Sequence, residues 1–489
     1  MVAEEPRAAA RHLRHQPRGR NLMTSSLTVG AADASESAAL SARFNSGALN
    51  PMLHAPLLPL LIRLALPTVA VMLMQTVLSV AETYFVSGLG VDAIAAASLV
   101  VPVMLLMTMV SNGGVGGGVS SAVARALGAG RQDEAESLVW HSVAIAIAAG
   151  GLFAVTAIAA GPMLYRGLGG TGASLQQALR YSNILFGGAV LFWVPTLLQS
   201  ALRGAGNVRT PALIMLGGVC AGLIISPVLI LGWLGLPRMG IAGAGVAQVL
   251  CTAGSLVAIV ASMRSAGSKL RLRRYPLRRD HFGAILGVGL LSTLNAAMST
   301  LSIAAITAAA GTFSVATIAG YGIASRLEML LVPVMFGFGT AAIAVVGTSI
   351  GAGDVARARR AALVNALFVG GVLEVLGLCV AFMPSLWMSH FTNDPDVLAV
   401  AGHYLRVMGP AYGFIAIALA LYFAGQGARR VGWPLAAGVL RFVCALSAAA
   451  LVFAGKLSLE SAFLLVAGGA IVGAAVTVWG FARVKWGSC

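Results

Sequence analysis

The feature that most constrains the fold of this chain is a series of long apolar runs separated by short connectors that hold most of the charge. Apolar residues make up 58% of the 489 residues and charged residues only 10%, whereas soluble domains usually carry about a quarter. Most runs reach the roughly 20 residues that a helix needs to cross a bilayer. We therefore predict an all-α integral membrane protein with twelve transmembrane helices, at 57–86, 92–123, 137–162, 176–202, 210–233, 240–263, 282–310, 315–349, 358–383, 397–425, 433–455 and 460–482.

The distribution of basic residues predicts the orientation of these helices. Alternate connectors hold nearly all of the arginine, and the connectors on the opposite side offer only Arg166, Arg238 and Lys456. Because cytoplasmic loops of membrane proteins carry an excess of Lys and Arg, both termini are expected in the cytoplasm. The arginine-rich composition is typical of a bacterial protein, so we expect a bacterial inner membrane location. The same asymmetry accounts for the net charge of +16 without a nucleic-acid partner.

An internal repeat divides the chain. Three motifs recur at a constant offset of 223 residues. Each half contains six spans, and because six is an even number, both halves enter the membrane from the same side. Such a parallel repeat predicts two halves of six spans each, with a cavity between them. The paired motifs are Gly128-Ala-Gly130 with Gly351-Ala-Gly353, Ala178-Leu-Arg-Tyr181 with Ala401-Gly-His-Tyr404, and Gly204-Ala-Gly-Asn-Val-Arg-Thr-Pro211 with Gly427-Ala-Arg-Arg-Val-Gly-Trp-Pro434.

Four segments follow from this organisation. Residues 1–55 are predicted to be a disordered, basic cytoplasmic tail, because no apolar stretch of the secretory type follows its arginines. Residues 56–264 are the expected N-lobe and residues 281–485 the expected C-lobe. The connector between them, 265–280, is strongly basic. It serves either to anchor the topology or to bind anionic lipid headgroups, and membrane lipids are expected partners.

Glu82 is the strongest candidate functional residue, because it lies within the first apolar run. A carboxylate in lipid costs about 3 kcal/mol on insertion scales, so such a residue is expected to face a bundle interior or a wet cavity and to have a function. Gln75 and Ser79 precede it by seven and three positions and share its helix face at ~3.6 residues per turn. We predict that Glu82 faces such a cavity and that Gln75 and Ser79 line it.

Other polar residues lie inside later spans. Glu328 is either one half of an ion pair with Arg441 or Arg406, or an acid that attracts cationic substrates into a C-lobe cavity. Asn295 and Ser299 recur at helical spacing and either line the cleft or pack between helices. Tyr321 is a candidate for stacking against a cation.

The remaining motifs predict neither a metal site nor a cofactor. Four of the five cysteines lie in apolar runs, with no paired spacing that would ligate a metal. The stretch Asn112-Gly-Gly-Val-Gly-Gly-Gly118 lacks the lysine and the strand-to-helix context of a nucleotide loop. We expect it instead to loosen the second span, allowing it to bend or to approach another helix closely.

The order of these motifs resembles the multidrug and toxin extrusion (MATE) family over about residues 57 to 485. The first span carries Pro67, Gln75, Glu82-Thr-Tyr-Phe-Val86 and Gly88-Leu-Gly90, similar to the family's Pro…Gln…Asp-Thr-x-Phe-Val-Gly-x-Leu-Gly. Later matches include Gln199-Ser-Ala-Leu-Arg-Gly-Ala-Gly-Asn207 and Gly322-Ile-Ala-Ser-Arg-Leu-Glu328. The resemblance implies two six-helix lobes that form a V with a central cleft. It also implies export of organic cations and amphipathic drugs by alternating access, in exchange for H⁺ or Na⁺. The first-span acid, here Glu82, would bind this coupling cation.

The chain departs from the family pattern at positions that bear on the coupling ion. The family's first-span acid is usually Asp, and the Asn and Asp that many members carry in the fifth span correspond here to Gly222 and Ser226. Because Na⁺ needs several oxygen ligands and a proton only one carboxylate, H⁺ is the expected coupling ion, with Na⁺ as the alternative. The expected protein is a monomeric antiporter and no enzyme. The alternative function is a lipid-linked saccharide flippase of the wider superfamily.

Overall fold

The computed structural model describes residues 51–265, 267–484 and 486. Of the predicted tail, residues 1–55, the first fifty lie outside the described residues. The chain divides into two compact units, Met1–His54 and Ala55–Cys489. Within the first unit the described residues form one short helix, α2 (Pro51–His54). All other elements belong to the second unit.

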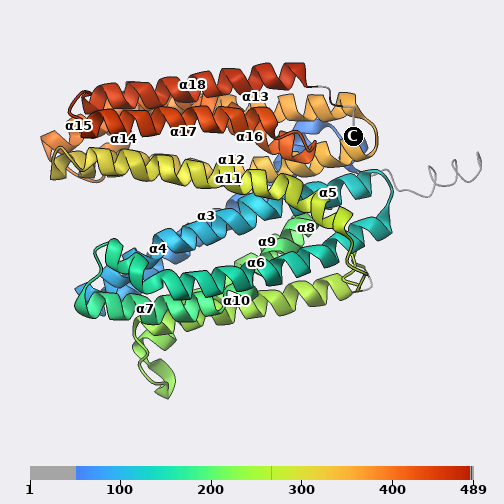
Figure 1. Ribbon diagram of the computed structural model, residues 1–489, viewed down its shortest axis with the longest axis horizontal. Helices are drawn as coiled ribbons and strands as arrows, with labels where there is room; N and C mark the ends of the chain where they lie inside the picture. Colours follow the sequence, from blue (N-terminus) through green and yellow to red (C-terminus); the bar gives the residue numbers. More distant parts are fainter. Residues whose placement is uncertain (1–50, 266, 485, 487–489) are drawn as a thin grey trace, which may run out of the picture. The chain divides into compact units, whose positions relative to one another are not determined.

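The second unit is built from helices in two consecutive groups, which the chain colours separate in Figure 1. The N-lobe comprises α3 (Leu57–Ser87), α4 (Val91–Thr108), η1 (Met109–Val115), α5 (Gly116–Gly128), α6 (Gln132–Gly167), α7 (Gly172–Gly187), α8 (Ala189–Gly204), α9 (Arg209–Leu231), η2 (Trp233–Gly235) and α10 (Ile241–Arg264). The C-lobe comprises α11 (Arg279–Ala310), α12 (Val315–Gly351), α13 (Val355–Phe382), α14 (Ser385–Met388), α15 (Pro395–Met408), η3 (Gly409–Ala411), α16 (Tyr412–Gly427), α17 (Gly432–Phe453) and α18 (Leu459–Arg483).

These helices confirm the predicted twelve spans. Eleven helical segments among the described residues are long and apolar enough to cross a membrane. The pair α7 and α8, which meet at an angle of 47°, completes a twelfth span. Many apolar side chains of the long helices are exposed on the molecular surface. This exposure is expected for helices that are surrounded by lipid rather than by water. The protein is therefore a multi-span membrane protein.

The internal repeat extends to details of the backbone. Gly130 and Gly353, 223 positions apart, both end a helix with positive φ, at 72° and 80°. Gly206 has φ 78°, and its repeat equivalent, Arg429, has φ 57° and is the sole non-glycine residue with positive φ in the described chain. Because side chains other than glycine rarely adopt this conformation, its retention at Arg429 shows that the repeat preserves the shape of the loop.

The two lobes contact each other where their arginine-bearing connectors begin. A Cβ atom at Gly128 would overlap the carbonyl oxygen of Thr348, and one at Gly351 would overlap the carbonyl oxygen of Arg125. The two contacts are repeat equivalents of each other. The backbones of α5 and α12 thus cross at a distance that only glycine permits, with one glycine contributed by each helix.

The glycine-rich part of the second span forms the π-helix η1, between α4 and α5. Gly114 lies against Thr293 of α11, and Gly118 lies against the Ile285 carbonyl of the same helix. The predicted close helix contact is confirmed. Ile285 belongs to the hydrophobic core of the N-lobe, whereas Ile306, near the other end of α11, belongs to that of the C-lobe. Helix α11 therefore runs from one lobe to the other.

The connector before α11 is docked on the start of α6. Buried Glu136 accepts hydrogen bonds from the backbone N–H of Arg271 at 3.3 Å and from the Tyr275 hydroxyl at 3.2 Å. Nε2 of fully buried His141 accepts from the backbone N–H of Arg278 at 2.8 Å. Leu270 is fully buried. The basic side chains remain on the surface, at Lys269, Arg271, Arg273, Arg274, Arg278 and Arg279.

Candidate functional site

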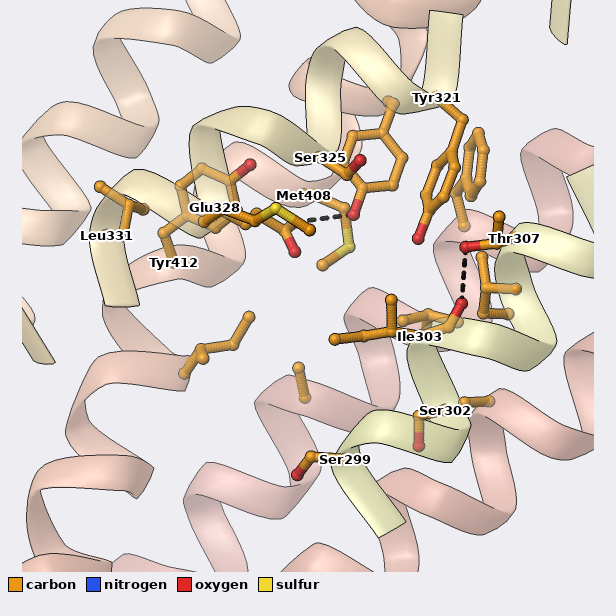
Figure 2. Close-up of a pocket in the computed structure, with 18 of the residues that line it drawn as sticks. Ser299, Ser302, Ile303, Thr307, Tyr321, Ser325, Glu328, Leu331, Met408 and Tyr412 are labelled. Atoms are coloured by element: carbon orange, nitrogen blue, oxygen red, sulfur yellow. Dashed lines mark hydrogen bonds between the residues drawn. The ribbon is translucent and has the colours of Figure 1, made fainter. Parts of the chain in front are cut away.

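A cavity of about 480 Å³ lies within the C-lobe, a size that suits a small organic ligand. Helices α11, α12, α15, α16, α17 and α18 supply its walls, and most of the lining is apolar. The polar lining residues are Ser299, Ser302, Thr307, Tyr321, Ser325, Arg326, Glu328, Tyr404, Tyr412 and Arg441. Figure 2 shows Ser299 and Ser302 of α11 on the opposite side of an open space from Glu328 of α12, and Thr307 of α11 beside Tyr321 of α12.

Glu328 is the centre of this cavity's chemistry. Its Oε1 accepts a hydrogen bond of 2.6 Å from the hydroxyl of Tyr404. The Tyr412 hydroxyl lies close enough to interact electrostatically with Glu328, and Figure 2 places the two side chains next to each other. That hydroxyl is buried and has no hydrogen-bond partner among the described residues. The Glu328 side chain is partly buried and lines the cavity, so a ligand in the cavity can reach it.

Aromatic rings form one wall beside this carboxylate. The rings of Tyr321 and Tyr404 meet edge to face, with their centroids 5.3 Å apart. The ring centroid of Phe463 lies 4.8 Å from that of Tyr404. Phe463 also stacks on Tyr321 at 6.0 Å. Ring faces attract cations, and more strongly in a site shielded from water. The predicted role of Tyr321 is compatible with this position, and Tyr404 is buried beside Glu328.

The expected ion pair of Glu328 is not observed. Within the part of the chain that the structure describes, no lysine or arginine nitrogen lies within 4.0 Å of this carboxylate. Arg441 shares the cavity and interacts with Glu328 through its charge over a longer distance. The stem of Arg441 packs on Gly473. Arg406 does not line the cavity. The Tyr404 hydroxyl, rather than a guanidinium group, is the direct partner.

Glu82 lies in the N-lobe, near the end of α3. Its carboxylate makes no hydrogen bond or ion pair with the described residues. Tyr181 of α7 and Cys251 of α10 are close enough to feel its charge. Glu82 is half-buried, whereas Gln75 and Ser79, on the same face of α3, are exposed and line none of the described cavities. An unpaired carboxylate in this setting is suited to bind and release a cation.

The other candidates divide between the cavity and helix packing. Ser299 lines the cavity, whereas Asn295 points at Gly438 of α17. Glu374 accepts a hydrogen bond from the backbone N–H of Gly413 at 2.9 Å and holds α13 against α16. The structure thus brings Ser299, Tyr321 and Glu328 together and places Glu82 in the other lobe.

The fifth-span positions offer few ligands for a metal ion. Gly222 lies against Leu78 of α3 and Cys251 of α10. Ser226 is fully buried, and its hydroxyl has no hydrogen-bond partner among the described residues. Over residues 51–265, 267–484 and 486, no three His, Cys, Asp or Glu side chains gather where they would hold a metal ion. Glu82 is the carboxylate available on this side of the N-lobe.

The sequence analysis missed Met408 and Tyr412 as cavity residues. Tyr404, Met408 and Tyr412 all line the cavity, and they follow one another at intervals of four residues. That spacing places side chains on one helix face, so it was a usable signal. The intervening Pro410 and the 3₁₀ turn of η3 (Gly409–Ala411) do not remove these residues from the cavity wall.

Comparison with known proteins identifies similar chains. The MatE family model matches residues 67–228 and 292–451. A protein of Shewanella oneidensis named "FAD transporter" is 29% identical over 377 residues, which cover 75% of this chain and 82% of the relative. A "Probable multidrug resistance protein NorM" of Bradyrhizobium diazoefficiens is 32% identical over 337 residues, 66% of this chain and 69% of the relative.

Solved structures share the fold. "Crystal structure of MATE in complex with MaL6" matches with a TM-score of 0.81 and 22% identity, covering 90% of this chain and 98% of the other. "Outward-facing conformation of a multidrug resistance MATE family transporter of the MOP superfamily" matches with a TM-score of 0.79 and 24% identity, covering 89% and 98%. The twelve-helix architecture of this chain is therefore the fold of these structures.

Proposed function

The chain belongs to the MatE family, and from this premise we propose that it exports organic cations and amphipathic drugs in exchange for protons by alternating access. The observation that carries the proposal is the C-lobe cavity. It is of drug size and largely apolar, and it combines the Glu328 carboxylate with the rings of Tyr321, Tyr404 and Phe463. A negative charge and aromatic faces are the groups that recognise a hydrophobic cation.

Glu82 is the proposed coupling residue. Because no described residue neutralises its carboxylate, protonation and ionisation change the charge of the N-lobe interior by one full unit. A proton needs this single acceptor, whereas Na⁺ needs several oxygen ligands, and Gly222 offers no side-chain oxygen. The proposal therefore favours H⁺ over Na⁺. It also retains a bacterial inner-membrane location, cytoplasmic termini and a monomeric state.

Export of an anionic dinucleotide is a second candidate. It is suggested by the relative named "FAD transporter" and by Arg326 and Arg441, which line the same cavity. Glu328 opposes the binding of an anion, as it opposes the pyrophosphate of a lipid-linked saccharide. We therefore rank the flavin dinucleotide second and the saccharide flippase third.

The coupling ion is tested in proteoliposomes loaded with a monovalent cationic dye. An imposed pH gradient is expected to drive saturable dye movement, and an imposed Na⁺ gradient is not, once an ionophore has collapsed the pH gradient. Dye efflux that is sustained by Na⁺ alone would contradict proton coupling. A parallel set of vesicles loaded with FAD separates the two substrate classes, because proton-driven movement of FAD without movement of dye would reverse their ranking.

A further inference from the structure

Each lobe places one acid within electrostatic range of the same tyrosine of the repeat. Tyr181 and Tyr404 occupy equivalent positions, 223 residues apart. Tyr181 lies within electrostatic range of Glu82 in the N-lobe, and Tyr404 donates its hydroxyl to Glu328 in the C-lobe. The acids themselves come from different helices, α3 and α12.

The two acids are not repeat equivalents. The position equivalent to Glu82 in the C-lobe is Ala305, and the position equivalent to Glu328 in the N-lobe is Leu105. Both lobes therefore have an acid within electrostatic range of this tyrosine, and the two acids come from non-equivalent positions of the repeat. Inheritance from one ancestral acid does not explain this arrangement, whereas a shared task for both lobes does.

We propose that Glu328 is a second proton-exchange site, and that Arg441 makes the proton expel an organic cation bound in the C-lobe cavity. The inference rests on the proposed function, export of cations in exchange for protons, and extends it to two protons for each monovalent cation. One proton exchanges at Glu82 and the other at Glu328. Each proton moves between a carboxylate oxygen and water, and no other bond changes.

The surroundings of Glu328 fit a group that alternates between two protonation states. In the ionised state its Oε1 accepts from Tyr404, and the unpartnered hydroxyl of Tyr412 offers a second donor nearby. In the protonated state the carboxyl group becomes a donor, and these hydroxyls are able to accept.

The charges that face Glu328 come from a small set of residues. Its own helix, α12, contributes Tyr321 and the exposed Arg326. Helix α15 contributes Tyr404, α16 Tyr412 and α17 Arg441. The lining residues of α11, α13 and α18 carry no titratable group. Arg441 and the exposed Arg326 are therefore the permanent positive charges that line the cavity, and Arg441 is the one that interacts with Glu328 through its charge.

Arg441 explains how a proton would displace the substrate. With Glu328 ionised, the carboxylate balances the guanidinium charge, and its unoccupied oxygen and the aromatic wall accept a cation. With Glu328 protonated, Arg441 is no longer balanced, and like charges repel strongly in a low-dielectric site. A packing role for Glu328 gives no reason for an arginine that shares the cavity without contacting the carboxylate.

The test counts the protons released when ethidium binds to the purified full-length protein. Calorimetry in two buffers of different ionisation heat gives this count, and it also equals the slope of log affinity against pH by linkage. The maximum is expected to be two for the wild type and one for Glu328→Gln. It is expected to be one for Glu82→Gln as well. Release of two protons by Glu328→Gln would overturn the inference.

Three further variants keep the result unambiguous. Glu374→Gln is the matched control, because Glu374 bonds a backbone N–H outside the cavity; it should still release two protons. Arg441→Met keeps the stem that packs on Gly473 and should reduce the loss of ethidium affinity between pH 8 and pH 5.5 from about a hundredfold to less than about tenfold. Unchanged pH dependence in this variant would overturn the role of Arg441.

Tyr404→Phe covers the case in which Glu328→Gln does not fold. It removes the hydroxyl that donates to Glu328, so the release of the second proton should move to a different pH while release of the first is unchanged. An unaltered pH profile would overturn the inference. Failure of the proposed function looks different, because Glu82→Gln would then release as many protons as the wild type whatever Glu328→Gln does.

Discussion

Substitution of Glu82 by Gln is expected to reduce proton-coupled dye exchange to the background of empty vesicles, while expression and folding stay at the wild-type level. Gln has nearly the same size as Glu, so the packing of α3 against α9 is retained, but it neither ionises nor carries an exchangeable proton at physiological pH. The carboxylate has no hydrogen-bond or ion-pair partner among the described residues that the substitution would strand. Dye flux under an imposed pH gradient measures the loss.

The control for this variant is Asp92→Asn. Asp92 is an exposed acid in the first turn of α4, ten residues after Glu82, and its neutralisation should leave exchange unchanged. Full drug–proton exchange by Glu82→Gln would remove Glu82 from the coupling mechanism. A variant that binds dye but releases one proton fewer than the wild type would instead locate the proton of the N-lobe at this residue.

The architecture was predictable from the sequence because the membrane simplifies it. Backbone groups in lipid must be satisfied within each segment, so a run of about 20 apolar residues is a helix. The 223-residue offset, found in three motifs, extends in the structure to the backbone conformation of paired residues, such as the positive φ of Gly206 and Arg429. The glycine-rich stretch before Gly118 was expected to allow close contact, and Gly114 and Gly118 provide it.

The membership of the cavity was only partly predictable. Helical spacing identifies residues on one face of one helix, such as Gln75, Ser79 and Glu82, but it does not tell which other helix that face meets. Glu328 was expected either to pair with an arginine or to be an acid of a C-lobe cavity. It lines the cavity, and its hydrogen-bond partner is the tyrosine hydroxyl of α15. Tertiary neighbours of this kind depend on the rotation of each helix about its axis, which apolar composition on all sides leaves undetermined.

Replacement of Gly128 or Gly351 by Leu is expected to hold the lobes apart at the α5–α12 crossing and to stop transport. Each glycine lies against a backbone carbonyl of the opposite lobe, which cannot rotate away as a side chain can. Overpacking costs roughly 1–3 kcal/mol, and about 1.4 kcal/mol shifts an equilibrium tenfold. The conformation closed at this end should therefore lose most of its population. Spin labels at Ala129→Cys and Ala352→Cys, both exposed, report the separation.

The matched control is Gly371→Leu in α13, because a Cβ there meets no atom within 4 Å. It should leave both the label distance and the dye flux unchanged. Since Gly128 and Gly351 are repeat equivalents that form the same contact in opposite directions, either substitution should lengthen the distance. If the label distance increased in one variant and stayed unchanged in the other, the lobes would pivot about the contact whose substitution has no effect. Unchanged distances with normal transport in both variants would show that this crossing does not open during the cycle.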